Sequence, residues 1–365
     1  MPKTCFFSPY LSKMHAGGGE KHLLEIALVV AQKNQVFIAI AQTQTASLAE
    51  YREFYSRFLG KNLSQLKFIW APLFTNASFW QKLWWTGKFD QLFYVTDGSL
   101  FFSLARRNFL HIQIPLAISK NSLLDRLKLI NWSLINVNSK FTKDVIEKYW
   151  RVKVDRVLYP SVNTNEFKSL TGKKPIILSV GRFFTHLHSK RQDILVDCFI
   201  KLREKYPQQF ANWQLVFVGK PEDQTFFDRV KAQSQGLPIK FLTEADRKKL
   251  TELFTRSSIL WHAAGYGIDE KREPEKVEHL GIVTLEAMAA GCVPVVVGKG
   301  GQKEILGEKL AELMWQTQEE CLVITHQLVA NQAVYRQLQK QVKARAQDFN
   351  QEKFTQAVKE LFGIF

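Results

Sequence analysis

The strongest constraint on the fold is an alternation of short apolar strands with helical segments, which runs along the chain twice. The predicted strands of the first series lie at residues 3–9, 35–41, 67–71, 92–96, 108–114, 134–137 and 156–160. Those of the second series lie at residues 175–181, 213–219, 238–242, 258–264 and 293–297. Strands that alternate with helices in this way indicate parallel, doubly wound sheets. We therefore expect an α/β protein with one such sheet in each half.

A polar stretch separates the two series. Residues 161–175 read SVNTNEFKSLTGKKP, and their Gly and Pro are typical of a hinge. A chain of 365 residues also exceeds the size at which a single core usually stops growing. We place the first domain at residues 1–166 and the second at residues 167–349. The chain after about residue 318 is predicted to be mostly helical.

The chain is basic, and the excess charge lies mainly in its first half. The net charge is +16, and residues 1–166 hold 21 Lys and Arg against 11 Asp and Glu. Such a surface attracts nucleic acid, anionic lipid or phosphorylated molecules. No recognisable nucleic-acid module is present, so nucleic acid is not an expected partner. Residues 78–89 and 121–132 mix Trp and Leu with Lys and Arg, which suits either core helices or a peripheral contact with an anionic membrane.

Cysteine usage and hydropathy bear on the compartment. The four cysteines, Cys5, Cys198, Cys292 and Cys321, are far apart, and none forms a CxxC pair. Cys5 and Cys292 lie in or beside predicted strands and are most simply small core residues, and the pattern indicates a reduced, cytoplasmic protein without a cysteine-based metal site. No run approaches the ~18 apolar residues of a spanning helix, and the start has no signal-peptide pattern. We expect a cytoplasmic protein that is at most peripheral on the inner face of the cell membrane.

One stretch, residues 278–304, has the character of a site. Glu278 and Glu286 are separated by seven residues, and Gly281 with Ile282 opens an Ala- and Met-rich helix between them. The helix is predicted to end at Gly291, a residue type that adopts positive φ at little cost. A β-branched strand follows, and glycines 298, 300 and 301 come after it. Open α/β sheets bind ligands at that end of a strand.

Two further strand-to-helix loops carry groups suited to phosphate. Gly17, Gly18 and Gly19 precede the first helix, where backbone amides favour an anion, although a simple flexible turn is the alternative. The loop lacks GxGxxG and an acid after the second strand, which argues against a dinucleotide fingerprint. After Gly181, Arg182 and Lys190 are two cations that could hold a diphosphate and stabilise its departure. A solvated basic loop is the alternative there.

The histidines do not form a metal-binding pattern. His186, His188, His262 and His279 lack an acidic partner at the spacing of a metal helix, so we expect no metal. His111, near the carboxyl end of its strand, is the histidine that we expect to contact a substrate.

The motifs occur in one order: GGGE, NSKFTKD (138–144), VLYPSVNTNEF (157–167), GRFF followed by a Lys, and E-x7-E leading into EAMAAGCVPVV. This order resembles the retaining glycosyltransferases of family 4, which have the GT-B fold, and the resemblance covers about residues 15–305. The run WHAAGYGIDEKREPEKVEHLGIVTLEA also resembles a bacterial branch related to dolichol-pathway mannosyltransferases. The family's fold implies two Rossmann-like domains that face a central cleft. It also implies that the last helix, 350–365, returns to the first domain.

The resemblance implies a role for each candidate residue. Glu286 would bind the donor ribose, with Gly181, Gly281 and Ile282 as further donor-binding positions. Glu278 would contact the transferred sugar. Arg182 and Lys190 would hold the diphosphate as catalytic cations, with Arg191 as the alternative to Lys190. Gly18 and Gly19 would approach the phosphates or the acceptor from the first domain, and His111 would lie near the transferred sugar.

The expected activity follows from the same resemblance. It is a retaining, metal-independent transfer of a hexose from a GDP-mannose or UDP-hexose type of donor to a lipid-linked or polysaccharide acceptor, in cell-envelope glycan biosynthesis. The nucleotide sugar is a co-substrate, and no other cofactor is implied. Two alternatives remain open at this point: a catalytically silent nucleotide- or lipid-binding protein, and a GT-B sugar epimerase.

Overall fold

The computed structural model describes residues 1–13, 17–42, 46–167 and 172–364, and these form two compact units. The first unit comprises Met1–Pro160 and Glu352–Phe365, and the second comprises Ser161–Gln351. The structure thus divides the chain after Pro160, whereas the sequence analysis divided it after Glu166. Residues 168–171 of the expected hinge lie outside the described residues.

The described residues of the first unit form a seven-stranded parallel sheet in the order β3-β2-β1-β4-β5-β6-β7. Its strands are β1 (Lys3–Phe7), β2 (Gln35–Ala41), β3 (Leu66–Ala71), β4 (Gln91–Thr96), β5 (Arg107–Ile112), β6 (Leu134–Val137) and β7 (Arg156–Val157). Its helices are α1 (Gly18–Val30), α2 (Leu48–Leu59), α3 (Phe79–Thr86), α4 (Leu123–Asn131), α5 (Lys140–Trp150) and α14 (Gln351–Phe362), with a 3-10 turn η1 (Pro9–Lys13).

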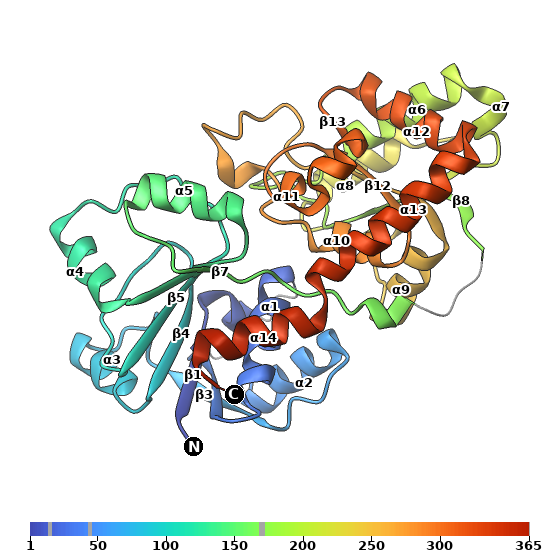
Figure 1. Cartoon of the computed structure of the whole chain (residues 1–365). Helices are drawn as coiled ribbons and strands as arrows, with labels where there is room; N and C mark the ends of the chain where they lie inside the picture. Colours follow the sequence, from blue (N-terminus) through green and yellow to red (C-terminus); the bar gives the residue numbers. More distant parts are fainter. Residues whose placement is uncertain (14–16, 43–45, 168–171, 365) are drawn as a thin grey trace. The chain divides into compact units, whose positions relative to one another are not determined.

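Both faces of this sheet are covered, which explains why its strands are almost continuously apolar. Successive residues of β1 point to opposite faces: Phe6 packs with α1, α2 and α14, whereas Cys5 and Phe7 pack on the side of α4 and α5. The last helix therefore contributes to a core built from the first residues of the chain. Figure 1 shows this helix, in red, alongside the blue and light-blue elements of the first unit.

The described residues of the second unit form a six-stranded parallel sheet in the order β10-β9-β8-β11-β12-β13. Its strands are β8 (Lys174–Val180), β9 (Gln214–Val218), β10 (Ile239–Leu242), β11 (Ser257–His262), β12 (Val293–Val297) and β13 (Met314–Trp315). Its helices are α6 (Gln192–Lys205), α7 (Pro207–Phe210), α8 (Gln224–Gln233), α9 (Arg247–Arg256), α10 (Ile282–Ala289), α11 (Gln302–Leu306), α12 (Gln318–Ala330) and α13 (Gln332–Ala346). Short 3-10 turns are η2 (Thr164–Phe167), η3 (Pro274–Lys276), η4 (Glu308–Leu313) and η5 (Gln347–Phe349).

The two parallel α/β sheets confirm the predicted fold class, and all twelve predicted strands are present in the described residues. The edge strand β13 was not predicted, because two residues leave no periodicity to detect. All four cysteines are buried with free thiols, which confirms the predicted core positions of Cys5 and Cys292 and adds Cys198 and Cys321. Gly291 has φ 67° directly after α10, as its predicted place at a helix end requires. No helix within the described ranges is long and apolar enough to cross a bilayer.

Candidate active site

The two cations predicted after β8 lie on one loop that folds back on itself. Gly181 follows the strand directly, and a Cβ there would come 2.5 Å from Cγ of Lys190, so the close approach of Lys190 requires glycine. Gln192, at the start of α6, donates to the carbonyl oxygens of Gly181 (3.2 Å) and Arg182 (3.1 Å). The loop is therefore closed at its base by the helix that follows it.

Lys190 reaches Glu278, and these two charges form the centre of the site. The Lys190 ammonium donates to Oε2 of Glu278, and Nε2 of His262 lies 2.9 Å from the same oxygen. All three side chains are at least 87% buried. Burial raises the pKa of Glu278, but Lys190 and His262 outweigh it and hold that pKa well below its usual value. Glu278 is therefore a buried carboxylate that stays ionised.

The buried His262 and His279 and the partly buried His188 surround this ion pair. The rings of His188 and His279 lie 4.8 Å apart, and the imidazole of His279 contacts the carbonyl oxygen of Glu275 at 3.0 Å. Burial lowers the pKa of both, and also that of His262 although Glu278 opposes it. The neutral imidazoles leave the positive charge of the cluster on Lys190. In the described part of the chain, no group of three or more His, Cys, Asp or Glu has metal-site geometry.

Arg182 lies near the same cluster but pairs elsewhere. Nη1 of Arg182 is 2.9 Å from each oxygen of Glu222, and the guanidinium lies 4.8 Å from the ring centre of Phe184. The charges of Lys190 and Arg182 both lower the pKa of His188, although burial is the larger cause. Both predicted cations are thus brought to one partly buried histidine. Their neighbour Arg191 pairs with Asp193 instead and does not face Glu278.

Glu286 occupies a second, separate charge cluster. It lies in α10 with 5% of its side chain exposed, and Nη1 of Arg247 is 2.7 Å from its Oε1. The same guanidinium holds both oxygens of Glu166 at 2.8 Å. Burial acts to lower the pKa of Arg247, but Glu286 and Glu166 raise it further than burial lowers it. One arginine therefore joins two carboxylates that are far apart in sequence.

The glycines after β12 serve packing at this site. A Cβ on Gly300 would lie 2.2 Å from the carbonyl oxygen of Glu278, and one on Gly301 would lie 2.3 Å from Cα of Leu280. The amide of Gly301 donates to the Glu278 carbonyl at 2.8 Å. This loop therefore fixes the backbone that carries Glu278, whereas the sequence analysis expected it to approach a ligand.

Gly281 and Ile282 begin α10 as predicted. Gly281 has φ 106°, and a Cβ there would lie 2.8 Å from Nε2 of Gln302. The Gln302 side chain is fully buried, and both its amide atoms lack a hydrogen-bond partner among the described residues. Buried amides are normally paired. The start of α10, the helix that carries Glu286, therefore lies beside a buried amide that has no hydrogen-bond partner among the described residues.

In the first unit, Gly18 and Gly19 form the first turn of α1. A Cβ on Gly19 would lie 2.3 Å from Oε1 of Gln113, whose Nε2 donates to the Gly19 carbonyl at 3.3 Å. The N-cap residue, Gly17, has no side chain to cap the helix. Residues 14–16, which belong to the expected glycine-rich loop, lie outside the described residues. Glycine at position 19 therefore leaves room for the side chain of Gln113.

His111 differs from the expectation. Its side chain is fully buried in the core of the first unit, where Nδ1 contacts Oδ1 of Asn136 and the ring stacks on Phe93 at 5.4 Å. Burial lowers the pKa of His111 to about 4. Helices cover both faces of the sheet that contains β5. The side chain of His111 therefore points into one of these layers and does not extend beyond the end of the strand. The structure thus places His111 in the core, and its expected contact with a substrate stays a prediction.

Three functional candidates were missed from the sequence: His262, Arg247 and Glu166. His262 ends β11, so its place at the carboxyl end of a parallel strand was a signal that could have been used. Arg247 begins α9 and Glu166 lies in η2, and nothing in their spacing connects them to Glu286.

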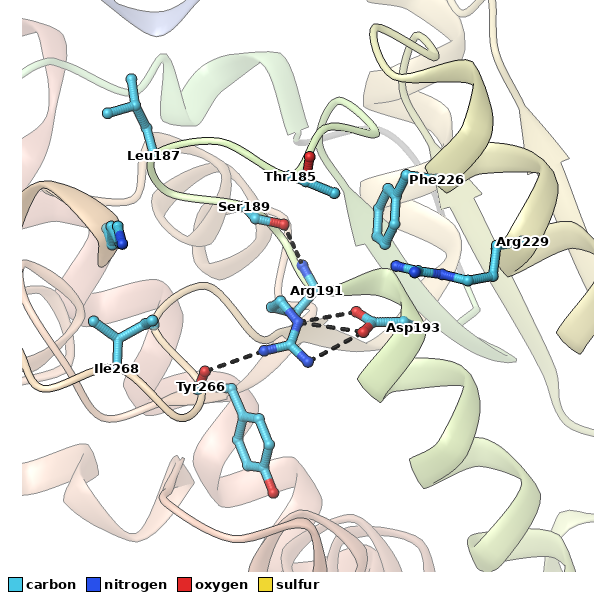
Figure 2. Close-up of a pocket in the computed structure, with 11 residues that line it drawn as sticks. Thr185, Leu187, Ser189, Arg191, Asp193, Phe226, Arg229, Tyr266 and Ile268 are labelled. Carbon is cyan, nitrogen blue, oxygen red and sulfur yellow. Dashed lines mark hydrogen bonds and ion pairs between the residues drawn. The ribbon is translucent and has the colours of Figure 1, made fainter.

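A pocket adjoins the cationic loop. It has a volume of about 330 Å³ and is lined by the loop 185–193, by α8 and by the segment 265–276. Figure 2 shows Arg191 at its centre, bonded to Asp193 and to the carbonyl oxygen of Tyr266. Ser189 and Arg191 flank Lys190 in sequence, so the pocket is formed in part by the loop that carries Lys190.

Sequence comparison relates the chain to enzymes of glycan assembly. Residues 162–342 match the family of glycosyl transferases group 1. The GDP-Man:Man(3)GlcNAc(2)-PP-Dol alpha-1,2-mannosyltransferase of Dictyostelium discoideum is 27% identical over 61% of this chain and 45% of its own length. The human alpha-1,3/1,6-mannosyltransferase ALG2 is 26% identical over 56% of this chain and 55% of its own length. The matched segment thus spans about half the length of these relatives.

Structural comparison covers the whole chain. Anabaena Alr3699/HepE, solved in complex with UDP-glucose, superposes with a TM-score of 0.70 at 17% identity, covering 100% of both chains. WaaG, a glycosyltransferase involved in lipopolysaccharide biosynthesis, superposes with a TM-score of 0.63 at 13% identity, also covering 100% of both chains. At these identities the likeness shows the fold alone. Residues 162–342 therefore belong to the glycosyl transferases group 1 family, and the chain as a whole has the GT-B glycosyltransferase fold.

Proposed function

We propose that this protein is a retaining glycosyltransferase that uses a nucleoside-diphosphate sugar. The observation that carries the proposal is the buried Lys190–Glu278–His262 cluster beside Arg182, at the carboxyl ends of β8 and β11. It combines cations for a diphosphate with a carboxylate that remains ionised for sugar hydroxyls. The family match supports the transferase activity, and the mannosyltransferase relatives favour GDP-mannose over UDP-hexoses as the donor.

Each group has a role in this proposal. Lys190 and Arg182 bind the diphosphate and neutralise the charge that develops as the bond between it and the anomeric carbon breaks. The Arg182–Glu222 pair is partly exposed, so exchanging Glu222 for phosphate costs little. Glu278 orients the sugar, and Glu286 accepts hydrogen bonds from the ribose. These cations perform the role that a divalent metal has in other transferases, so we propose that the reaction needs none.

The retention that we propose does not use a covalent nucleophile from this cluster. Retaining hydrolases use a pair of carboxylates, but among the described residues Glu278 has only Lys190 and histidines as charged or titratable contacts. We propose that the acceptor oxygen bonds to the anomeric carbon on the face from which the diphosphate leaves. The acceptor proton passes to the departing phosphate. A structural neighbour, trehalose-6-phosphate synthase, has been studied as an enzyme of glycosyl transfer with retention, which supports the proposal.

The experiment is a donor screen that measures nucleoside-diphosphate release. GDP-mannose, UDP-glucose and ADP-glucose are each supplied with lipid-linked and polysaccharide acceptors. We expect release with one donor, and near-total loss of it in Arg182→Ala and Glu286→Gln, while Lys220→Ala serves as a basic control on the surface. Normal turnover in both site variants would contradict the assignment. Nucleotide binding without release would favour the catalytically silent alternative, and conversion of the donor without an acceptor would favour an epimerase.

We also propose that the protein meets its acceptor at an anionic membrane surface. On α3, Trp80 and Trp84 are 64% and 70% exposed, and on α4, Leu123 and Ile130 are 79% and 77% exposed. Single exposed apolar residues are ordinary, but a group of this size is not. Lys82, Lys88, Arg126 and Lys128 lie on the same two segments. Apolar and basic side chains together suit an interface of anionic lipid and water.

The two helices are parts of one surface of the first unit. The amide of Leu104 donates to Oγ1 of Thr86 at the end of α3 (2.9 Å), and the amide of Ser103 donates to Oδ1 of Asn131 at the end of α4 (2.7 Å). The segment between them thus joins their carboxyl ends, and Figure 1 shows both helices at the edge of this unit. The dolichol-linked substrates in the names of the relatives fit such a location.

Flotation with vesicles tests this location without any assay of activity. We expect the protein to float with vesicles of phosphatidylcholine and phosphatidylglycerol at low salt, and to float poorly with phosphatidylcholine alone. Replacing Trp80 and Trp84 by Ser should reduce flotation, whereas Val334→Ser, at an exposed apolar position of the second unit, should not. The idea fails if the wild-type protein does not bind anionic vesicles at low salt.

A further inference from the structure

The pocket beside the cationic loop has the size and walls of a ligand site. Its volume of about 330 Å³ falls at the lower end of the range for small-molecule pockets. Leu187, Ile268 and Phe226 supply apolar walls, and Thr185 and Ser189 supply hydroxyls. In Figure 2 these side chains surround one space, with the guanidinium groups of Arg191 and Arg229 at its lower side.

The loop that forms one wall has a costly backbone conformation. Leu187 and Arg191 both line the pocket, and both have positive φ, 49° and 47°. A non-glycine residue in this region costs of order 1–3 kcal/mol, and such residues cluster at ligand and catalytic sites. Leu187 and Arg191 adopt this conformation within five residues of each other. It allows Lys190 to turn toward Glu278 while Leu187 and Arg191 face the pocket.

The opposite wall is also held in place before any ligand arrives. Oε2 of Glu270 accepts from the amide of Gly300 at 2.8 Å, and Nζ of Lys299 donates to the carbonyl of Ile268 at 2.6 Å. Nη1 of Arg191 donates to the carbonyl oxygen of Tyr266 at 3.4 Å, which ties the two walls together. A preformed pocket binds without the entropic cost of ordering its walls.

The charge in the pocket is positive. Arg191, Arg229 and Lys276 line it, and the carboxylate that opposes them there is Asp193. Arg191 is paired with Asp193, and Lys276 with Glu273. Arg229 makes no ion pair within 4 Å with any residue that the structure describes, although its charge helps to lower the pKa of Asp223 after the hydrogen bonds that this carboxyl accepts from Phe226 and Thr185. Its guanidinium lies 5.2 Å from the ring centre of Phe226. The amino-terminal end of α6, a 14-residue helix, begins at Gln192 and adds a partial positive charge.

We propose that this pocket binds a small phosphate monoester. Arg229 and Arg191 bind the phosphate, for which a guanidinium is well shaped, and Leu187, Ile268 and Phe226 contact the organic part. The proposal concerns binding alone and does not depend on the glycosyl-transfer function. Ser189 and Arg191 flank Lys190, and Lys276 is two residues from Glu278, so the bound molecule contacts the segments that carry both residues of that pair.

Titration calorimetry with glycerol 3-phosphate, and with glycerol as the uncharged control, tests the proposal. We expect the wild-type protein to bind glycerol 3-phosphate and not glycerol, and Arg229→Gln to weaken binding by about tenfold or more. Lys231→Gln makes the same charge change on α8 outside the pocket and should bind as the wild type does. GDP should bind the Arg229→Gln variant normally, because Arg229 is not among the proposed donor residues.

Three results would overturn the proposal. The first is no binding of glycerol 3-phosphate by the wild-type protein, and the second is unchanged binding by Arg229→Gln. The third is loss of binding in Arg182→Gln with normal binding in Arg229→Gln, which would place the phosphate at the donor residues. None of these results affects the donor screen, so failure of this proposal and failure of the proposed function are distinguishable.

Discussion

At the scale of single residues, the site is a set of buried charges that compensate one another. Glu286 and Glu278 are both carboxylates with little exposure, and each is held by one cation, Arg247 or Lys190. A buried ion pair contributes little net stability compared with apolar residues, but loss of one partner is costly. These pairs are therefore better explained by a charged ligand than by a need for stability.

Removing Arg247 should destabilise the second unit. Arg247→Met takes the guanidinium from Glu286 and Glu166, and we expect a loss of about 2 kcal/mol in the free energy of unfolding, since Arg247 keeps 27% of its side chain exposed. Urea denaturation measures it. A second substitution, Glu286→Gln, should restore part of the loss because it removes the buried charge. Arg256→Met, in an exposed pair, is the control, and an equal effect there would refute the argument.

The buried histidines should make the fold sensitive to mild acid. Burial is the main cause that lowers the pKa of each of five histidines: His22, His111, His188, His262 and His279. Folded, they remain neutral below the ordinary value of 6.5, whereas the unfolded chain takes up protons there. Their contribution to stability is therefore complete above pH 6.5 and is lost as the pH falls through the folded pKa values.

Urea denaturation across this range measures the effect. We expect stability to fall between about pH 6.5 and pH 5, above the range where Glu278 and Glu166 would contribute, because the pKa values of both carboxyls are lowered. In His111→Asn the slope of stability against pH should be shallower, whatever the stability at neutral pH. Equal unfolding free energies of the wild-type protein at pH 7 and pH 5 would be inconsistent with buried neutral histidines.

At the scale of elements, the site depends on close contacts between the backbones of two loops. Gly300 and Gly301 follow β12 and lie against residues 278–280, which precede α10. The sequence predicted this strand, this helix and the spacing of their two acids, because these follow from local periodicity. It did not predict that Gly300 and Gly301 serve the other loop, or that Arg247 and Glu166 meet Glu286, because those contacts join segments with no shared pattern.

Gly300→Ala tests the loop contact. A Cβ there would overlap the Glu278 carbonyl at 2.2 Å, so the substitution should displace the backbone that carries Glu278. Gly236→Ala is the matched control, because Gly236 also has positive φ, 75°, but nothing lies within 4 Å of the added atom. Backbone strain should cost roughly 1–2 kcal/mol in both variants, and Gly300→Ala should lose about 1–3 kcal/mol more. Equal losses in urea denaturation would show that the loop contact is unimportant.

At the scale of the molecule, the first unit is closed by residues distant in sequence. The last helix, α14, places Phe354, Val358, Leu361 and Phe362 in the core of the first unit, and Arg107 donates to the Phe362 carbonyl at 3.1 Å. From the sequence this return could be inferred only through the resemblance to a family, since an amphipathic helix does not indicate which sheet it covers. The burial of His111 could not be predicted from the sequence either, because the helices that cover it come from other parts of the chain.

Truncating Phe362 should therefore weaken the first unit. The ring is 1% exposed and stacks on Phe109 at 4.6 Å, so Phe362→Ala should cost about 3–5 kcal/mol. Limited proteolysis should then cut the first unit faster, while fragments of the second unit persist. Gln356→Ala, at an exposed position of the same helix, should cause little change. Unaltered proteolysis of Phe362→Ala would contradict the assignment of α14 to this core.

The measurement that tests the central claim most directly is the anomeric configuration of the transferred sugar. The proposed site, with Lys190 and Arg182 on the diphosphate and with Glu278 held in an ion pair, provides for attack on the face from which the diphosphate leaves. Proton NMR of the first product formed from an α-linked nucleotide sugar should show an α-glycoside. A β-glycoside as the first product would contradict the account.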